Sequence, residues 1–256
     1  MTSIRRIEIE NFVNTLLSPF LFDDQSINGL QIEGTEEIKR VAFAVSATRD
    51  SIFKACELGA DTLIVHHGIL WKYQGPKTIT GPFHKRVAPL IQNNMNLLAY
   101  HLPLDAHLEI GNAACVARHL PLENLVPFAP YKKVPIGVKG ILKTPMKANE
   151  LKKIIKNALN HEVIMASPTN ERLISSLGII TGGASGSWTE AVSEGVDAFL
   201  TGEISEHAWN DSQEANVTMY AAGHYATELF GIQELMKKIK ENFSVEVFFI
   251  DSENPV

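Results

Sequence analysis

Three short and nearly continuous apolar runs constrain the fold of this chain more than any other feature. They read VAFAV at 41–45, TLIV at 62–65 and NLLAY at 96–100. Strands without polar alternation are covered by helices on both faces, which is typical of parallel sheets. Helix-like segments separate the runs, so the sequence predicts an α/β fold.

The same patterns place elements along both halves of the chain. The first half predicts helices at 7–17, 50–58, 84–93 and 112–119 and strands at 40–46, 61–65 and 97–101. The second half predicts strands at 137–142, 177–180, 198–201, 217–222 and 245–250 and helices at 149–160, 189–194 and 226–242. The last helix has an apolar stripe at helical spacing.

Four prolines lie close together in mid-chain, at Pro121, Pro127, Pro130 and Pro135. Such a cluster indicates a connection or a domain boundary. A chain of 256 residues is long enough for two modest domains. We therefore predict that residues 129–222 form a second α/β domain, inserted into a first domain made of 1–128 and 223–256.

Composition excludes several classes of protein. The net charge of −6 argues against nucleic-acid binding as the main role of the protein. A lysine-rich region at 132–156 favours a solvated surface with an amphipathic helix, and a weak nucleotide-facing patch stays open. Two cysteines are too few for a disulfide scaffold. With no apolar run of membrane-spanning length and no signal-peptide pattern, we expect a cytoplasmic protein.

Ligand-capable side chains follow two of the apolar strands. His66 and His67 end the strand at 61–65, and Asp105 comes shortly after the next one. In open α/β sheets, ligands gather beyond the carboxyl ends of strands. Asp105 alone would be taken for a turn or helix N-cap residue. Its place after a neighbouring strand favours a shared cleft with the histidines.

A third segment, AAGHYATE at 221–228, carries His224 and Glu228 four residues apart, on one face of a helical turn. The five side chains together offer three imidazoles and two carboxylates. Nitrogen and oxygen ligands suit Zn, Mn, Fe, Co or Ni. The set lacks the cysteine thiolates that are typical of structural zinc sites, which argues against such a site. Two ions about 3.5–4 Å apart would form a hydrolytic two-metal centre.

Five sequence blocks resemble one known family. NGLQIEG (28–34), DTLIVHHG (61–68), HLPLDAH (101–107), TGEISEH (201–207) and AAGHYATE (221–228) are similar, in this order, to the GTP cyclohydrolase 1 type 2 homologue family. Its members are also called Nif-three-like dinuclear metal centre hexameric proteins. The chain resembles the compact bacterial type. Many members have HHP where this chain has Gly68 after the two histidines.

The resemblance implies specific residues and a specific assembly. It places two divalent metal ions per subunit on His66, His67, Asp105, His224 and Glu228. It also implies two linked α/β domains with mixed sheets flanked by helices, assembled as a toroidal homohexamer. The expected reaction is metal-dependent hydrolysis of a nucleotide such as GTP. His101 and Glu203 are the acid/base candidates. The alternative for His101 is a hydrogen-bond partner of a ligand, and the alternative for Glu203 is an N-cap or salt-bridge residue. His207 fits a helix surface better.

Several interpretations stay open at this point. The segment TGGASGS at 181–187 favours a tight turn over a phosphate loop, because the lysine of that motif is missing. Trp71 and Tyr73 favour a cavity wall over base stacking. Besides a GTP hydrolase, the sequence allows another two-metal phosphoesterase or amidohydrolase, or a non-enzymatic metal-binding, regulatory or nucleic-acid-associated ring.

Overall fold

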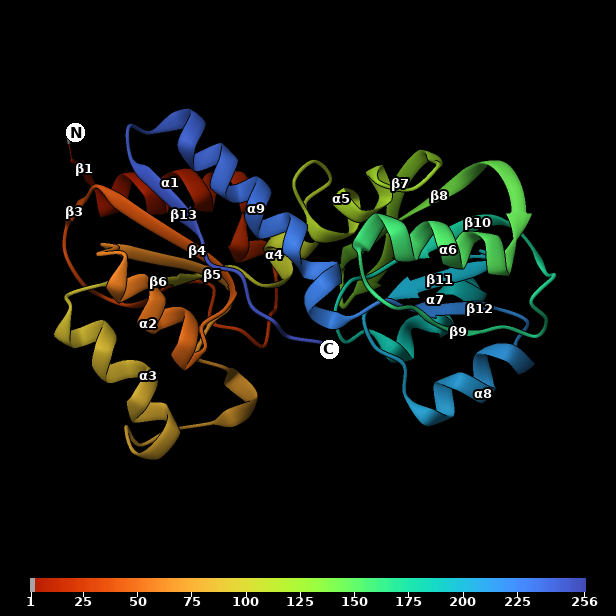
Figure 1. The fold of residues 1–256 in the computed structure, drawn as a ribbon, viewed down its shortest axis with the longest axis horizontal. Coiled ribbons are helices and arrows are strands. Elements are labelled where there is room, and N and C mark those ends of the chain that lie inside the picture. Colours follow the sequence, from red (N-terminus) through yellow and green to blue (C-terminus); the bar gives the residue numbers. More distant parts are fainter. Residues whose placement is uncertain (1–2) are drawn as a thin grey trace. The chain divides into compact units, whose positions relative to one another are not determined.

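The computed structural model describes residues 3–256 and contains two mixed sheets flanked by helices, as predicted (Figure 1). The chain divides into two compact units. The first unit is Met1–Leu104 with Ile232–Glu253, and the second unit is Asp105–Gly231 with Asn254–Val256. Each unit contains one of the large sheets.

The sheet of the first unit has five strands, in the order β13, β4, β5, β6 and β2. Their bounds are Glu246–Phe249, Arg40–Ser46, Thr62–His67, Asn96–Ala99 and Gly29–Ile32. The first four run parallel and β2 is antiparallel to β6. Because β4, β5 and β6 are parallel, their carboxyl ends meet at one edge of the sheet, where Ser46 pairs with His67.

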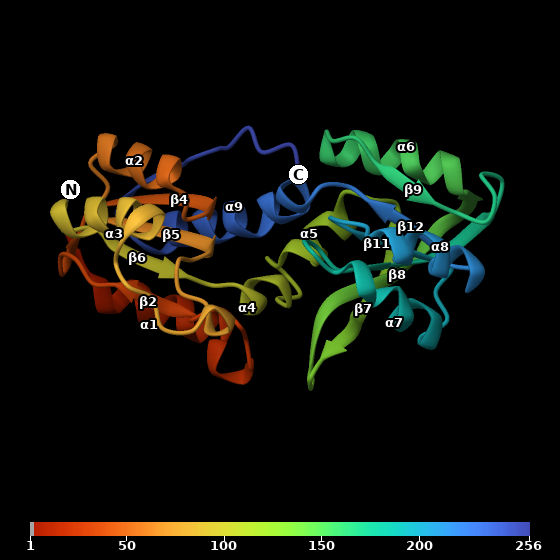
Figure 2. The ribbon, with the colours of Figure 1, turned by 90° about the horizontal axis from the view of Figure 1, so that it is seen from below.

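Helices cover both faces of this sheet (Figures 1 and 2). On one face lie α2 (Arg49–Glu57) and α3 (Gly81–Gln92), and on the other lie α1 (Arg6–Leu17) and α9 (His224–Asn242), the latter from Ile232 onward. The α2 and α3 side chains pack on alternate residues of the three apolar strands in one buried cluster. The continuous apolar runs are therefore explained by coverage on both faces.

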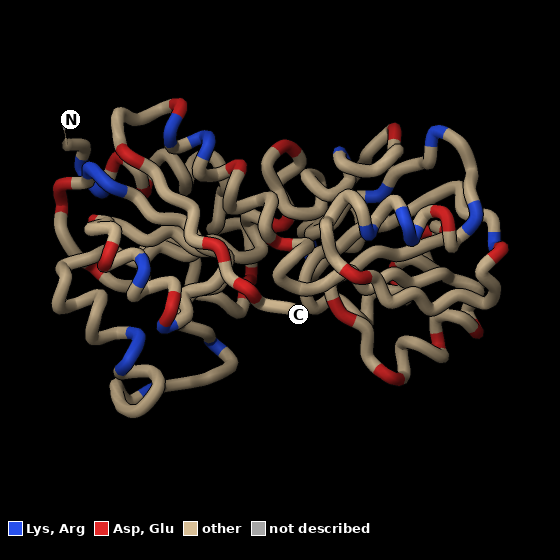
Figure 3. The backbone as a smooth tube through the Cα atoms, viewed as in Figure 1, with Lys and Arg blue, Asp and Glu red and all other residues tan. Residues whose placement is uncertain are grey.

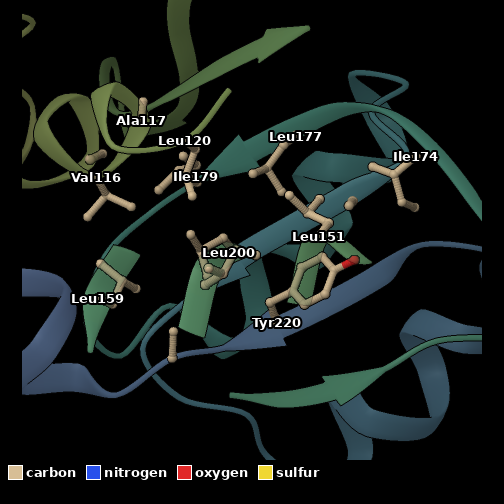
Figure 4. Packing of buried hydrophobic residues seen from close by; sticks show 14 of the residues in the cluster. Val116, Ala117, Leu120, Leu151, Leu159, Ile174, Leu177, Ile179, Leu200 and Tyr220 are labelled. Atoms are coloured by element: carbon tan, nitrogen blue, oxygen red, sulfur yellow. The ribbon is translucent and has the colours of Figure 1, made fainter. Parts of the chain in front are cut away.

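The sheet of the second unit has six strands, in the order β7, β8, β10, β11, β12 and β9. Their bounds are Leu122–Tyr131, Val134–Lys147, Leu173–Ile179, Ala198–Thr201, Thr218–Ala221 and Ile164–Ala166. Among its neighbouring strand pairs, only β10–β11 and β11–β12 are parallel. Helices α5 (Asn112–Arg118) and α6 (Ala148–Leu159) pack on one face, in the cluster shown in Figure 4. Helices α7 (Trp188–Ser193) and α8 (Glu206–Glu214) pack against the other buried cluster.

The proline cluster is neither a connection nor a domain boundary, and that interpretation was wrong. Pro127 and Pro130 lie within β7, and Pro135 lies within β8. The strand β7 is at the edge of the sheet, where a residue without an N–H need not break a ladder hydrogen bond. Since α5 and β7 pack on β8, the segment 105–128 belongs to the second unit, and the inserted segment is 105–231.

Some elements escape the sequence patterns. The strands β2, β7 and β9 and the helix α8 were not predicted; α8 is short and polar, with only Ala208 and Ser212 buried. The strand β5 continues two residues further than predicted and includes both histidines. The remaining elements are short: β1 (Ile4–Arg5), β3 (Glu37–Ile38), α4 (Leu102–Asp105) and the 3-10 helices Pro19–Leu21, Lys72–Gln74 and Ser185–Ser187.

The lysine-rich region forms a surface, as expected. The helix α6 buries Leu151, Ile155 and Leu159 and turns its lysines outward. Lys147 and Lys156 pair with Glu171 and Glu162, both at 2.5 Å. Figure 3 shows basic and acidic residues interleaved over the chain. Within residues 3–256, none of the helices has both the length and the apolar character needed to cross a membrane.

Candidate metal centre

Three histidines gather at the carboxyl edge of the sheet in the first unit. His66 and His67 are the last residues of β5, and His101 follows β6. One ring nitrogen from each of the three histidines lies within 4.8 Å of the corresponding nitrogens of the other two. The ring centroids of His66 and His67 are 4.5 Å apart, and those of His66 and His101 are 5.0 Å apart. The parallel ends of neighbouring strands thus bring His101 beside a histidine pair from a different part of the chain.

Hydrogen bonds determine which nitrogen of two of these rings carries a proton. His66 is fully buried, and its Nδ1 lies 3.0 Å from the carbonyl oxygen of Tyr100. A carbonyl only accepts, so Nδ1 donates and Nε2 keeps its lone pair. His101 Nδ1 likewise donates to the carboxylate of Asp24 at 2.8 Å. His67 Nδ1 lies 2.9 Å from the Ser46 hydroxyl.

Asp24 is a buried carboxylate that sequence reasoning missed. Besides the bond from His101, it accepts hydrogen bonds from the backbone N–H groups of Ser26 and Leu102 and from the side chain of Asn28. Burial raises the pKa of this carboxyl, but the bonds from His101, Asn28 and Ser26 outweigh it and lower the pKa to about 2. Asp24 is therefore ionised at neutral pH and holds His101 in place. The NGLQIEG block, which contains Asn28, was the one nearby signal.

Replacing Asp24 by asparagine should destabilise the protein by about 2–3 kcal/mol, because an amide cannot accept all these bonds and its NH₂ group would face buried donors. Urea denaturation at pH 7 measures this loss. The control is Asp211→Asn, on the exposed face of α8, which should change stability by less than about 0.5 kcal/mol. Equal stability of Asp24→Asn and wild type would contradict the assigned role.

The same carboxylate predicts a pH dependence. The pKa of Asp24 in the folded protein, about 2, lies below its unfolded value of about 3.9. Its contribution to stability is therefore present above pH 4 and is lost as the pH falls towards 2, by about 2 kcal/mol in total. We expect the stability difference between wild type and Asp24→Asn to shrink over this window.

Gly68, which directly follows the histidine pair, has a local explanation. A Cβ at this position would lie 2.4 Å from the side-chain amide of Gln31. That amide accepts hydrogen bonds from the N–H groups of Ile69 and Leu70 and donates to the carbonyl of Ile27. Gln31 thus holds the turn that follows the histidine pair, and glycine leaves room for it.

A second cluster lies at the corresponding edge of the sheet in the second unit. The parallel strands β10, β11 and β12 are followed by Gly182, Glu203 and His224. His224 is the first residue of α9 and Glu228 lies one turn later. His224 Nε2 is 3.2 Å from Glu228 Oε2, and its Nδ1 is 2.5 Å from Glu203 Oε1.

The two carboxylates control the charge of His224. Burial lowers the pKa of this imidazole, but hydrogen bonds and charges from Glu228 and Glu203 outweigh that effect and raise the pKa to about 9. Glu203 accepts from Nδ1, so it directs the other nitrogen, Nε2, towards Glu228. Glu203 therefore forms a salt bridge with His224, which is one of the two roles that the sequence allowed besides acid/base chemistry.

Asp105 belongs to this second cluster. It is the last residue of α4 and is 6% exposed. Its Oδ1 accepts hydrogen bonds from Asn112 Nδ2 at 2.8 Å and from Thr181 Oγ1 at 3.2 Å. Carboxylate oxygens of Asp105 and Glu228 lie within 4.8 Å of each other. The structure therefore brings Asp105, His224 and Glu228 together.

The glycine-rich segment 181–187 forms the tight turn that the sequence favoured. Gly182 has a φ of +67°, a conformation that costs a residue with a Cβ about 1–2 kcal/mol. A Cβ there would lie 2.1 Å from Glu228 Oε1 and 3.0 Å from His224 Nε2. The turn thus packs directly on the imidazole–carboxylate pair, and only glycine fits.

Three further candidates lie outside both clusters. His207 is exposed on α8, with Nε2 3.2 Å from the Ser205 hydroxyl, which fits a surface residue. The ring centroid of Trp71 lies 5.0 Å from that of His101 and 6.0 Å from that of His67. Trp71 therefore forms a wall beside the histidines, whereas Tyr73 is 67% exposed.

Each cluster has the donor chemistry of a metal site. The first unit offers three imidazoles, and the second offers one imidazole and two carboxylates that are almost fully buried. Buried carboxylates are costly unless a cation or hydrogen bonds compensate them. Nitrogen and oxygen donors of this kind suit divalent transition metals.

Curated relatives match almost the whole chain. A protein from Pyrococcus abyssi is 40% identical over 97% of this chain and 98% of its own length. One from Vibrio cholerae is 39% identical over 99% of this chain and 100% of its own length. Both are named GTP cyclohydrolase 1 type 2 homolog, which confirms the resemblance seen in the five sequence blocks.

Solved structures and a family model agree with these relatives. The protein ybgI, described as of unknown function, has a TM-score of 0.92 at 35% identity and covers 99% of this chain and 100% of its own. A protein from Thermus thermophilus, TTHA1606, has a TM-score of 0.88 at 28% identity over 99% of this chain and 100% of its own. The family model matches residues 4–255. The chain therefore belongs to the Duf34/NIF3 (NGG1p interacting factor 3) family.

Proposed function

We propose that this protein binds two divalent metal ions through His66, His67, Asp105, His224 and Glu228 and uses them to hydrolyse a nucleotide such as GTP. The observation that carries the proposal is the donor chemistry at the two sheet edges. Each edge presents buried imidazole or carboxylate groups whose outer hydrogen bonds leave specific atoms to act as ligands. Such outer partners are typical of metal-binding histidines and carboxylates.

When bound, the two ions would supply the Lewis acidity that activates water in two-metal hydrolases. The chain's own contribution is to present the donors in the correct form. The carbonyl of Tyr100 keeps the lone pair of His66 on Nε2, and Asn112 and Thr181 orient the carboxylate of Asp105. Zn, Mn, Fe, Co and Ni all accept this donor set.

Two further residues are proposed to move or hold protons. His101 lies among the nitrogens of the first cluster, and Asp24 holds its Nδ1–H, so its Nε2 is placed to accept and return a proton. Glu203 holds the Nδ1–H of His224. Glu203 is therefore a positioning residue in this proposal, and His101 is the acid/base candidate.

The nucleotide is suggested by the relatives, which are named GTP cyclohydrolase 1 type 2 homolog. Elemental analysis under metal-replete conditions should find two ions per chain in wild type and no more than one in His66→Ala. Product analysis with GTP should show turnover that His66→Ala loses. Less than one ion per chain in wild type would reject the two-metal proposal. Two ions without turnover of any nucleotide or phosphoester would reject the hydrolase and leave a metal-binding protein.

We also propose the assembly and compartment that the family resemblance implies. The protein would be a homohexamer in the cytoplasm, a reducing compartment that keeps the thiols of Cys56 and Cys115 from forming disulfides. Light scattering coupled to size-exclusion chromatography should give six times the mass of one chain. A monomeric or dimeric mass at micromolar concentration would contradict the hexamer.

A further inference from the structure

A cavity of about 480 Å³ lies in the first unit, beside the loop that follows the histidine pair. Residues of β2, of the 70–79 loop and of α3 line it. This volume is within the range of small-molecule binding sites. None of the proposed metal ligands lines the cavity, so its role can be considered apart from the metal centre.

The walls of the cavity are almost entirely apolar. Aliphatic side chains such as Ile32, Leu70 and Val87 line it together with the aromatic rings of Trp71 and Phe83. In the described part of the chain, no carboxylate, amide or hydroxyl side chain belongs to the lining. A purine needs such groups to read its polar edge, because specific sites discriminate by hydrogen bonds. The lining residues that the structure describes therefore offer no side-chain acceptor for the polar edge of a purine.

Two lysines are the charged groups of the lining. Lys77 Nζ lies 4.9 Å from the centroid of the Phe83 ring, in a cation–π arrangement. Lys72 Nζ is 3.9 Å from Asp23 Oδ1, at the long limit of an ion pair, and both side chains are largely exposed. Such an ion pair contributes little in water, so the ammonium group of Lys72 can also bind an anionic ligand.

The indole of Trp71 joins the cavity to the histidines. It lines the cavity, its Nε1 donates to the carbonyl of Gly68 at 3.0 Å, and its ring packs against His67 and His101. A molecule in the cavity would therefore contact the same ring that forms a wall of the first cluster.

We propose that this cavity binds a hydrophobic organic anion, an aromatic or medium-chain carboxylate. The apolar walls would hold its body, and the ammonium groups of Lys72 and Lys77 would hold its carboxylate. Apolar lining gives affinity and the few charged groups give orientation, as in other small-molecule sites. The proposal stands independently of the hydrolase, since it needs neither the metal ions nor the second unit.

Calorimetric titration of 1-naphthoate into chelator-treated full-length protein tests this proposal, because removing metals prevents carboxylate binding at the metal centre. We expect one saturable site per chain. The affinity should fall roughly 10-fold in Lys72→Gln/Lys77→Gln, as expected for losing charge-assisted contacts. The matched control carries Lys85→Gln, an exposed lysine of α3 outside the lining, and should bind like wild type.

A second probe separates the anionic group from the apolar body. The neutral analogue 1-naphthol should bind wild type at least several-fold more weakly than 1-naphthoate does. In the double lysine variant, 1-naphthol and 1-naphthoate should bind equally. The proposal is overturned if no saturable binding occurs, if Lys85→Gln weakens binding as much as the double variant, or if 1-naphthol binds wild type as tightly as 1-naphthoate. The metal stoichiometry of the same preparations reports separately on the proposed hydrolase.

Discussion

Replacing Glu228 by glutamine is expected to weaken metal binding by more than about 100-fold. Loss of groups that merely support a ligand typically costs 10–100-fold, so the loss of a charged ligand should cost more. Glu228 is 2% exposed and its Oε2 lies 3.2 Å from His224 Nε2. Glutamine keeps the shape of the side chain but removes the negative charge, so the fold should persist while the affinity falls.

Competition with a chromophoric chelator measures this affinity, and circular dichroism checks the fold. The matched control is Glu241→Gln, which removes the same charge from the same helix where the side chain is 63% exposed. That variant should bind metal like wild type. Retention of wild-type affinity in Glu228→Gln would exclude Glu228 as a ligand.

Replacing Gly182 by alanine is expected to damage the second cluster without removing any ligand. The new Cβ would lie 2.1 Å from Glu228 Oε1, so either the turn or the carboxylate must move. The φ of +67° adds a cost of about 1–2 kcal/mol for a residue with a Cβ. We expect metal affinity to fall about 10–100-fold, the range seen when the support of a ligand is lost, together with lower thermal stability.

Gly186→Ala is the matched control for this substitution. Gly186 lies in the same segment, but a Cβ there meets no heavy atom within 4 Å and its φ is not in the left-handed region. Chelator competition and thermal unfolding should therefore give wild-type values for Gly186→Ala. If both alanine variants bound metal equally, the close packing of the turn on Glu228 would have no functional role.

Part of the fold was readable from the sequence because local patterns report burial. The predicted strands at 40–46 and 198–201 coincide with β4 and β11 from end to end. A strand that is buried on both faces contains almost no polar residues. Its apolar run therefore covers the whole strand, and its first and last residues can be predicted from the sequence. The short polar helix α8 and the edge strand β7 lack such patterns, and the sequence missed them.

The candidate site also has features that the sequence predicts and features that it does not. Histidines after a buried strand and the spacing of His224 and Glu228 were visible locally, as was a tight turn in the glycine-rich segment. Asp24 was not, because it lies in an irregular loop and meets His101, 77 residues away, only in the folded protein. The packing of Gly182 on Glu228, from different elements, was equally invisible.

The sequence by itself therefore determined the class of fold, the strand ends at which the donors lie, and the kinds of donor. These properties depend on periodicity and residue type along short segments. Only the tertiary structure decided which carboxylate or carbonyl holds each imidazole nitrogen and where a cavity remains. Those features depend on contacts within about 3 Å between distant segments, and the register of strands and the packing of loops set such contacts.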